Sequence, residues 1–531
     1  MMLDADQDGS SAVLGAAEQS DSDSALQTMV VGQRGAWQWP ALVGVVSFLI
    51  NIAWVTTPAI WYDEAATVSV AMRPGRDILT FITTRADVVH GLYYLAMHEW
   101  LGLTGYSMFA LRFPSVVAVT VASTGLVVLG QLLENRRAGV MAGLVFIATP
   151  ACCFYGIEAR PYAAAIAGAV LLTCVAFWMS HAEGWQQFRA LAALYCVFLA
   201  LLVYLHLYTV FMVAPHAFLL LDRARPTGRV LSARSVVWLG AVFVAVLASL
   251  PLILLAWRQR RQVAFISDVY SSGTAQLKSV LVEAWVGDNL TLAVVFVLFA
   301  LLGFRTLAGR QRWAIAAWMW CPALVLSLPG LLFGLDFWLP RYMQFSVPAL
   351  CLAVAFGIDH VSARFSSSLF VCGLALAAVF TLALPTWADD RTPAGKSTGW
   401  LWIASLADNL SEIRSDSPSG KAGVVFGMSP SGRQSTRWVS VAYPEALIGL
   451  DDISLYKTAI EANDFISYSV DSATVLNRLT GGGLTCVYVM DTASRPFFSA
   501  DQVAQIEAQG FTEIEQRAAS TARVTRMCRP A

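Results

Sequence analysis

Long apolar segments separated by short polar ones run through most of the chain, and this pattern predicts repeated crossings of a membrane. The first apolar segment, residues 41–60, has the roughly 20 residues that a helix needs to cross the hydrocarbon core. Later segments of the same kind bring the prediction to about eleven transmembrane helices. The later predicted spans are 107–130, 138–154, 162–180, 189–205, 208–221, 236–256, 289–304, 312–333, 342–358 and 368–386.

Three parts of the chain depart from this pattern. Residues 1–36 are polar, acidic and rich in Ser and Ala, which predicts a disordered tail. Residues 61–106 are polar and aromatic, and the amphipathic pattern at Gly91–Leu103 predicts helices that lie at the membrane interface. Residues 391–531 are far less apolar than the transmembrane part, residues 37–390, and we expect them to form a soluble domain.

The C-terminal segment combines short strand-like runs with one helical pattern, which predicts an α/β domain. The strand-like runs are Gly423–Met428, Val439–Tyr443 and Cys486–Met490, and the helical pattern covers Ser499–Gln509. A segment of roughly 130 residues is long enough to hold a core of its own. It lacks a glycine fingerprint for nucleotide binding, because Gly481–Gly483 precedes a strand-like run instead of following one.

Basic residues in short loops predict the orientation, since such loops favour the cytoplasmic side. With an odd number of spans, the N-terminus lies inside and the α/β domain outside. One loop, with Arg258, Arg260 and Arg261, breaks the rule on the outer side, which an anionic partner there would explain. The residues predicted inside are Arg136, Arg137, Arg223, Arg225, Arg229, Arg234, Arg305, Arg310, Arg312 and Arg364.

Composition supports this picture and narrows the partners. The chain is 57% hydrophobic and 13% charged, with a mean hydropathy of +0.60, so lipid must cover part of its surface. A net charge of −1 argues against a nucleic-acid partner. Most of the nine cysteines lie in apolar stretches, whereas Cys486 and Cys528 could pair in an oxidising compartment. Arginine strongly outnumbers lysine, which suggests a GC-rich bacterial source and hence a bacterial cytoplasmic membrane.

Two adjacent carboxylates, Asp63 and Glu64, follow the first predicted span directly. They could be ordinary solvated residues of the interface. They also open the polar outer segment, where a carboxylate is placed to take a proton from an acceptor hydroxyl. Arg112, at the start of the next span, either joins such a site or extends its side chain toward the interface.

The outer segment holds a second polar group at residues 85–94. An aromatic belt with a satisfied histidine is the alternative to a binding site, which the group favours. The residues are Arg85, Asp87, His90, Tyr93 and Tyr94.

Three further polar groups lie in outer connections. Glu158 and Arg160 could pair with each other and only fix their loop. His206 lies at a depth where a histidine is functional by default, although it could cap a helix instead. Arg341 and Tyr342 lead into a later span. The predicted topology puts all these groups on one face, and the inner loops have few acids or histidines, which indicates one site on the outer face.

Several of these groups form short motifs in a fixed order: Asp63-Glu64, His90-Gly91-Leu92-Tyr93-Tyr94, Leu111-Arg112-Phe113-Pro114-Ser115, Glu158-Ala159-Arg160-Pro161-Tyr162, His206 and Arg341-Tyr342. By these motifs the chain resembles the GT-C class of membrane glycosyltransferases over residues 40 to about 360. It is similar in particular to the protein O-mannosyltransferases and the lipid A aminoarabinose transferase. The resemblance implies a GT-C type polytopic helical fold.

The resemblance also implies the reaction. The donor would be a sugar on a polyprenyl phosphate at the outer leaflet, and the transfer to a hydroxyl would invert the anomeric centre. Mannose is favoured over arabinose, and the acceptor would be a glycan, a lipoglycan or a protein. Asp63 matches the family's catalytic carboxylate, with Glu64 as its neighbour.

The same resemblance assigns the groups that hold the substrates. Arg160, Arg341 and Tyr342 match the residues around the lipid phosphate. The outer-loop arginines expected to join them are Arg258, Arg260 and Arg261. The residues expected at the substrate and acceptor site are Arg85, Asp87, His90, Tyr93, Tyr94, Glu158 and His206.

The chain departs from the family at one motif. The family often has His-Pro-Pro-Leu-Tyr-Tyr where this chain has His90-Gly91-Leu92-Tyr93-Tyr94, with one residue fewer and neither proline. A different loop shape is therefore expected around His90.

No cofactor is required by the sequence, and a divalent metal stays an open alternative. Asp63, Glu64, His90 and His206 carry oxygen and nitrogen donors on the predicted outer face. They lack the close spacing of a motif such as HExxH.

Other functions fit parts of the pattern. A transporter or flippase for the same lipid would need the arginines but not Asp63. It should also have internal repeats or broken helices at the midplane, and the sequence shows no clear repeat. A ligase that moves a whole glycan from a lipid carrier, or a receptor that works through its outer domain, are further alternatives.

Overall fold

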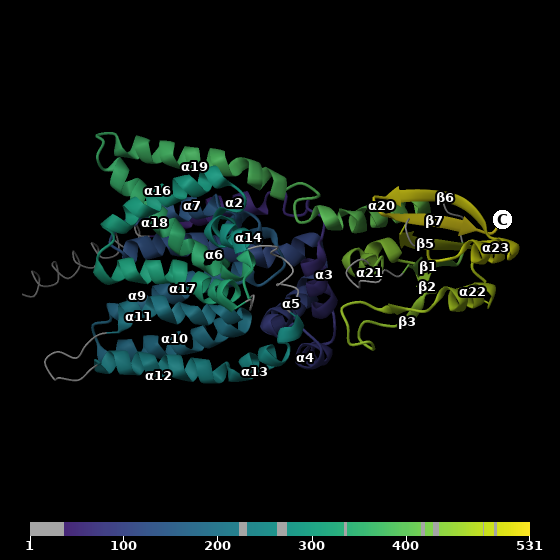
Figure 1. Cartoon of the computed structure of the whole chain (residues 1–531), viewed down its shortest axis with the longest axis horizontal. Helices are drawn as coiled ribbons and strands as arrows, with labels where there is room; N and C mark the ends of the chain where they lie inside the picture. Colours follow the sequence, from purple (N-terminus) through teal and green to yellow (C-terminus); the bar gives the residue numbers. More distant parts are fainter. Residues whose placement is uncertain are drawn as a thin grey trace, which may run out of the picture.

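The protein is described by a computed structural model with two parts, a helical bundle and an α/β domain that projects from one end of it (Figure 1). The predicted tail, residues 1–36, lies outside the described residues. Those described are 37–221, 231–262, 273–333, 337–415, 420–427, 435–481, 483–492 and 496–530.

Six helices among the described residues are long and apolar enough to cross a membrane, or up to nine spans if each of three bent pairs is one. Two shorter apolar helices also coincide with predicted spans. The multi-pass architecture is thus confirmed, while the count of about eleven spans stays a prediction. The six are α6 (Met108–Leu132), α9 (Tyr162–Ser180), α10 (Trp185–Leu205), α17 (Gly309–Phe333), η6 with α18 (Pro340–Ser346, Val347–Ser362) and α19 (Ser368–Asp390).

The remaining helices of the bundle are shorter or bent. The bent pairs turn by 63°, 44° and 78° at their breaks. They are α7 (Arg136–Ile147) with α8 (Pro150–Cys153) and η2 (Tyr155–Ile157), α12 (Ala233–Ala248) with α13 (Leu250–Arg258), and α14 (Gly273–Lys278), η5 (Ser279–Glu283) and α15 (Ala284–Val286) with α16 (Leu290–Thr306). The shorter apolar helices are α2 (Gln38–Ile52) and η3 with α11 (Leu207–Met212, Val213–Leu220).

Small residues let helices of the bundle approach closely, as is typical of membrane proteins. A Cβ atom at Gly303 of α16 would lie 1.9 Å from the Ala353 carbonyl oxygen of α18. A Cβ atom at Gly357 would lie equally close to the Phe299 carbonyl oxygen. The outer surface of the bundle instead exposes large apolar side chains such as Phe243 and Leu301, which fit a lipid environment.

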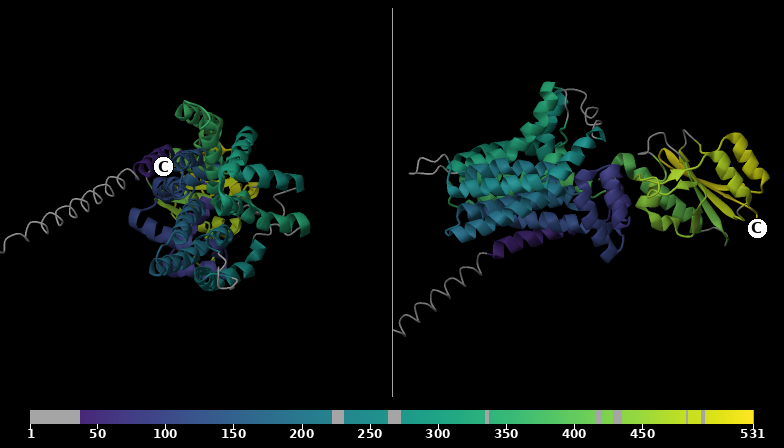
Figure 2. Two further views of the ribbon diagram at one scale, coloured as in Figure 1. Left: turned by 90° about the vertical axis from the view of Figure 1, so that its left-hand side faces the viewer. Right: turned by 90° about the horizontal axis from the view of Figure 1, so that it is seen from below.

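The polar outer segment folds into short helices between the bundle and the α/β domain (Figure 2). They are α3 (Tyr62–Ala71), α4 (Gly75–Thr84), η1 (Val88–His90) and α5 (Gly91–Thr104). α4 is amphipathic and buries Ile78, Phe81 and Ile82. The predicted helices of this segment are therefore present, and they lie at the end of the bundle that faces the α/β domain.

The C-terminal part forms a mixed five-stranded sheet in the order β2-β1-β5-β7-β6. β1 pairs in parallel with β2 and β5, and β7 is antiparallel to β5 and β6. The strands are β1 (Ala422–Phe426), β2 (Leu450–Asp452), β5 (Cys486–Thr492), β6 (Thr512–Ala519) and β7 (Ala522–Cys528), with a separate pair β3 (Leu455–Lys457) and β4 (Tyr468–Ser469). The helices are η7 (Thr398–Trp400), α20 (Leu401–Ser415), α21 (Trp438–Ala442), η9 (Pro444–Leu447), α22 (Ser472–Gly481) and α23 (Ala500–Ala508).

The α/β prediction is confirmed at three of its four runs. β1 and β5 fall on the first and last strand-like runs, and α23 falls on the helical pattern; Met428 lies outside the described residues. The strand predicted at Val439–Tyr443 is wrong, because this segment is the helix α21. Its apolar residues Trp438, Val439 and Ala442 share one helical face and pack near α3 and α20.

Candidate active site

The Asp63 carboxylate forms an ion pair with a guanidinium that lies 278 residues further along the chain. Arg341 of η6 donates from Nη1 to Asp63 Oδ2 at 2.9 Å. Asp63 lies in the first turn of α3, where the helix dipole favours a negative charge, and only 7% of the residue is exposed. The alternative of a solvated interface residue is therefore excluded for Asp63.

A second charged group surrounds Arg160. Its Nη1 atom donates to the Tyr94 hydroxyl at 2.9 Å and lies 3.7 Å from Asp87 Oδ2, while Asp87 Oδ1 is 2.6 Å from His90 Nδ1. Tyr94 also donates to Asp87. Burial raises the pKa of Asp87, but His90 and Arg160 outweigh it and hold that pKa well below its ordinary value. Arg160 thus pairs with Asp87 and not with Glu158.

These two groups adjoin each other. Asp63 lies within electrostatic reach of both Arg160 and His90. The Tyr162 ring lies 5.9 Å from the His206 ring and 6.5 Å from that of His90. The structure therefore brings three predicted outer connections and the outer segment, residues 61–106, into one polar cluster.

His206 and Tyr342 complete this cluster on its apolar side. Their rings lie 6.4 Å apart, and the His206 ring also packs against Phe345 at 5.8 Å. The backbone of His206 ends α10, whereas its Nδ1 atom has no hydrogen-bond partner. Side-chain capping of the helix is therefore excluded as the role of this imidazole.

Glu64 points to a different partner from its neighbour. Arg112 donates from Nε and Nη2 to the two Glu64 oxygens at 2.9 and 2.7 Å, and the Ala159 N–H donates at 3.1 Å. Both side chains are fully buried, so the alternative that Arg112 extends to the interface is wrong. Burial raises the pKa of Glu64, but Arg112 outweighs burial and keeps that pKa below its ordinary value.

Glu158 is buried without a hydrogen-bond partner for either carboxylate oxygen. Its hydrogen bonds are made by the backbone: the carbonyl oxygen accepts from the Ser115 hydroxyl at 2.5 Å and from the Arg160 N–H at 2.8 Å. Burial, together with the nearby carboxylates of Asp63 and Glu64, raises the pKa of Glu158 to about 7. Tyr93 is buried nearby. A buried carboxyl group of this kind is common where ligands bind.

The structure places the other predicted residues at the rim. Arg85 donates to Asp464 of the α/β domain at 2.7 Å, so it lies in the contact between the two parts. Gln259, between the outer-loop arginines, accepts from the Val88 N–H at 3.0 Å and brings this loop next to η1. The three exposed arginines there are Arg258, Arg260 and Arg261, of which Arg260 stacks on Trp257.

The four residues considered as metal ligands are not arranged around a common point where a metal ion could bind. Among the described residues, no group of three His, Cys, Asp or Glu side chains is placed to hold a metal ion. Glu64 is occupied by Arg112, and His90 is occupied by Asp87. The donor set of Asp63, Glu64, His90 and His206 therefore does not fit a metal site in this arrangement.

One buried cation of the cluster was not predicted. Lys396 follows α19 and donates to the Phe154 carbonyl oxygen at 2.5 Å. It is the one buried lysine among the four in the sequence, all of which the structure describes. Its position in a polar connection, Thr392–Thr398, offers no signal in the sequence that it would turn inward.

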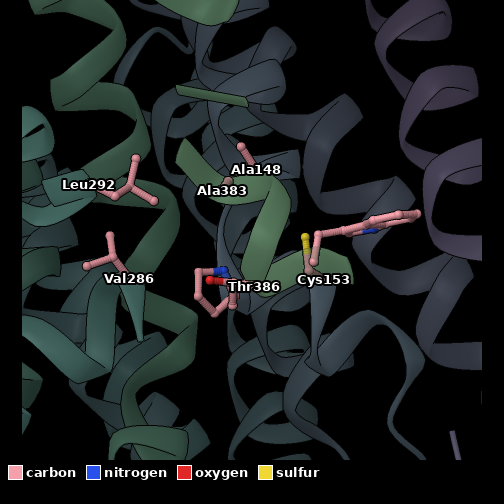
Figure 3. Close-up of a pocket in the computed structure, with 8 residues that line it drawn as sticks. Ala148, Cys153, Val286, Leu292, Ala383 and Thr386 are labelled. Carbon is pink, nitrogen blue, oxygen red and sulfur yellow. The ribbon is translucent and has the colours of Figure 1, made fainter. Parts of the chain in front are cut away.

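A separate apolar pocket lies between α8, the start of α16 and the end of α19 (Figure 3). No carboxylate, imidazole or guanidinium lines it, so it cannot supply acid–base chemistry. Its lining residues are Ala148, Pro150, Cys153, Val286, Leu292, Ala383, Thr386 and Trp387.

Comparison with solved structures identifies the fold. ArnT from Cupriavidus metallidurans matches with a TM-score of 0.55 and 11% identity, over 92% of this chain and 97% of ArnT. The chain has a GT-C fold. ArnT was solved in the apo state and bound to undecaprenyl phosphate, and both structures match equally well. The chain also matches the structure of the arabinofuranosyltransferase AftD from Mycobacteria, with a TM-score of 0.50 and 14% identity, over 92% of this chain and 41% of AftD. No family model and no curated protein matches the sequence.

Proposed function

We propose that this protein is an inverting glycosyltransferase of the bacterial cytoplasmic membrane. It moves a sugar from a polyprenyl-phosphate donor to a hydroxyl acceptor at the outer face. The observation that carries this proposal is the Asp63–Arg341 pair beside Arg160. Asp63 lies in α3, at the end of the bundle that adjoins the α/β domain (Figure 1). The binding of undecaprenyl phosphate by ArnT, which shares the fold, supports a lipid phosphate as part of the donor.

The chemistry follows from these groups. Asp63 takes the proton of the acceptor hydroxyl, whose oxygen attacks the anomeric carbon while the bond from that carbon to the phosphate oxygen breaks. Arg341 and Arg160 hold the departing phosphate, because a guanidinium stays charged and binds phosphate oxygens at two points. Arg341 pairs with Asp63. Donor phosphate competes with the carboxylate for Arg341, draws it away and leaves the carboxylate free to act as the base.

Glu64 has a supporting role in this scheme. Its two oxygens already accept from Arg112 and from the Ala159 N–H, so they are not free to accept a proton from substrate. Glu64 fixes the first turn of α3 against α6 and thereby directs Asp63 toward Arg341.

The sugar is mannose in this proposal, with arabinose as the alternative that the assay must include. AftD is an arabinofuranosyltransferase, so both donor types belong in one experiment. The acceptor is a glycan, a lipoglycan or a protein hydroxyl, and the α/β domain takes part in presenting it.

The test is transfer by the purified full-length chain from polyprenyl-phosphate mannose and polyprenyl-phosphate arabinofuranose. Asp63→Asn should lower turnover by about 10²–10⁴-fold, which is the usual contribution of a general base. Binding of polyprenyl phosphate should persist, because the arginines remain. Asp408→Asn is the matched control, since Asp408 is exposed on α20. Wild-type turnover in Asp63→Asn would exclude the base assignment, and lipid movement without transfer would favour a transporter.

A further inference from the structure

Lys396 reaches the site from the connection that leads to the α/β domain. Only 6% of it is exposed, which is rare for a lysine without an anionic partner. Its Nζ atom donates to the Phe154 carbonyl oxygen and lies 3.7 Å from the centre of the Phe154 ring. A single neutral carbonyl is weak compensation for burying an ammonium ion.

The connection holds Lys396 firmly in this position. Pro393 accepts from the Ala59 N–H at 2.9 Å, next to the start of α3. Gly395 makes a tight turn, since a Cβ atom there would lie 2.5 Å from the Asp390 carbonyl oxygen. Lys396 follows this turn directly, and its side chain is buried.

Glu158 is the nearby anion that lacks compensation. Its exposed fraction is 1%, and neither carboxylate oxygen has a hydrogen-bond partner. Lys396 is the leading charge that acts on it to favour ionisation, and Glu158 in turn is the leading charge that stabilises the ammonium. Among the described residues, Lys396 and Glu158 do not form a direct ion pair. The two Glu158 carboxylate oxygens are therefore free to bind a ligand.

The remaining groups around Glu158 are already engaged or oppose its ionisation. Glu64 is neutralised by Arg112, and Asp63 by Arg341. Arg160, two residues along the loop, is shared with Asp87 and Tyr94. The phenols that face Glu158, from α5 and η2, are Tyr93 and Tyr155. Lys396 is the leading cation acting on Glu158, and it also acts on Glu64 and on the buried Asp390, whose Oδ2 atom has no hydrogen-bond partner.

We propose that Glu158 binds hydroxyl groups of the donor sugar through its two free oxygens, and that Lys396 is a positioning residue that keeps this carboxylate ionised for the purpose. An ionised carboxylate is an acceptor only and can take hydrogen bonds from two sugar hydroxyls at once. This inference rests on the proposed function, because it assigns part of that site to the sugar. It also explains why the connection to the α/β domain contributes a cation to a cluster otherwise built from the bundle.

The first test does not depend on activity. Infrared titration of the full-length protein in nanodiscs should show a protonated carboxyl band that Glu158→Gln removes. In wild type this band should titrate near pH 7, in line with the raised pKa of Glu158. In Lys396→Met the midpoint should move up by about one pH unit or more, because a nearby opposite charge favours the ionised form. An unchanged midpoint would overturn the coupling even if the enzyme proved to have another substrate.

The second test uses the pH profile of transfer. If Glu158 acts as the carboxylate, kcat/KM falls as the pH drops through the pKa of Glu158. Lys396→Met should shift this fall to higher pH by the same amount as it shifts the infrared midpoint. Lys396→Arg should restore it, and the double variant with Glu158→Gln should be no worse than Glu158→Gln alone. Lys421→Met is the control, because Lys421 is an exposed lysine paired with Asp451. If Lys396 has a purely structural role, the losses of kcat/KM in Lys396→Met and Glu158→Gln should add in the double variant, and the acid side of the pH profile should not shift. That result would overturn the proposal.

The two tests separate this inference from the proposed function. If wild type shows no transfer but Lys396→Met still shifts the infrared midpoint, the glycosyltransferase assignment would be contradicted. The interaction between Lys396 and Glu158 would still be supported. Normal transfer with no effect of Glu158→Gln on the KM for the donor would refute the sugar contact alone.

Discussion

Several charges of the site lie in ion pairs, and Glu64–Arg112 is the most enclosed of these pairs. Both side chains are inaccessible, and Arg112 also donates to the carbonyl oxygens of Val55 and Pro58, each at 2.8 Å. Each of these acceptors lies in or before the turn that leads into α3. The pair therefore ties the first helix of the outer segment to α6.

Arg112→Met should destabilise the protein strongly, because it leaves the Glu64 carboxylate buried without its partner. Loss of one member of a buried ion pair costs about 3–5 kcal/mol. The measurement is thermal unfolding of the purified protein in detergent, where the variant should melt well below wild type. Arg189→Met, at an exposed arginine on α10, should melt as wild type does. Equal melting temperatures for the two variants would show that the pair contributes little.

Arg341 belongs to a different kind of pair, one that we expect to open when donor binds. Arg341→Ala should weaken binding of polyprenyl phosphate by about 10–100-fold, since a hydrogen bond to a charged group contributes about 1.5–3 kcal/mol. Direct binding measured by native mass spectrometry would test this. Arg364→Ala, predicted at the inner end, serves as the control. Unchanged affinity in Arg341→Ala would place the phosphate elsewhere.

At the scale of elements, one covalent link joins two strands of the α/β sheet. Cys486 of β5 and Cys528 of β7 are cross-strand neighbours and form a disulfide. A disulfide suits a domain outside the cytoplasm, where oxidising conditions preserve it. From the sequence, these two cysteines were expected to pair only in an oxidising compartment. The structure contains this disulfide.

Cys528→Ser should lower the stability of the α/β domain by about 2–4 kcal/mol, the usual contribution of a disulfide. Pulse proteolysis of the full-length protein in urea would report it as earlier cleavage within residues 420–530. Cys196→Ser, at a free cysteine of α10, should leave this cleavage unchanged. If the domain of Cys528→Ser resists urea like wild type, the sheet holds without the bond.

The elements that the sequence predicted best are those fixed by local pattern. The apolar spans, β1, β5 and α23 follow from periodicity and length. α21 was missed because five residues are too few for periodicity to separate a helix from a strand, and tertiary contacts of Trp438 decide the outcome. Short segments of this kind depend on neighbours that only the fold supplies.

The sequence predicted which segments of the chain meet at the site, but not which charged residues pair with each other there. Topology alone places the outer connections at one end of the bundle. Which charge meets which cannot be predicted in this way, because partners lie far apart in sequence: 278 residues for Asp63 and Arg341, and 379 for Arg85 and Asp464. Lys396 lies beyond the last span, where no motif marks it.

At the scale of the whole molecule, the α/β domain is packed onto the outer segment. The Phe465 ring meets the Phe81 ring of α4 edge to face at 4.9 Å, and Asp464 binds Arg85 at 2.7 Å. At the start of α3, the Tyr62 ring packs against the Trp438 ring at 5.2 Å. α3, which presents Asp63, is therefore held between the bundle and the domain.

Phe465→Ala should loosen this packing without unfolding either part. An edge-to-face aromatic pair contributes about 0.5–1.5 kcal/mol beyond the apolar area it buries, so local opening of α3 and α4 should become several-fold more frequent. Hydrogen exchange at residues 62–84 is the direct measurement. Because α3 carries the proposed base, kcat should fall with the loss of protection, while binding of polyprenyl phosphate through Arg341 should persist.

The matched control is Glu461→Ala, in the same segment of the domain. Glu461 is exposed and accepts only from Thr458 among the described contacts, so its loss should leave exchange in α3 unchanged. Faster exchange in Phe465→Ala with wild-type kcat would show that the domain stabilises α3 without affecting the position of Asp63. Unchanged exchange in both variants would mean that the bundle alone orders the outer segment, and that the domain acts only on the acceptor.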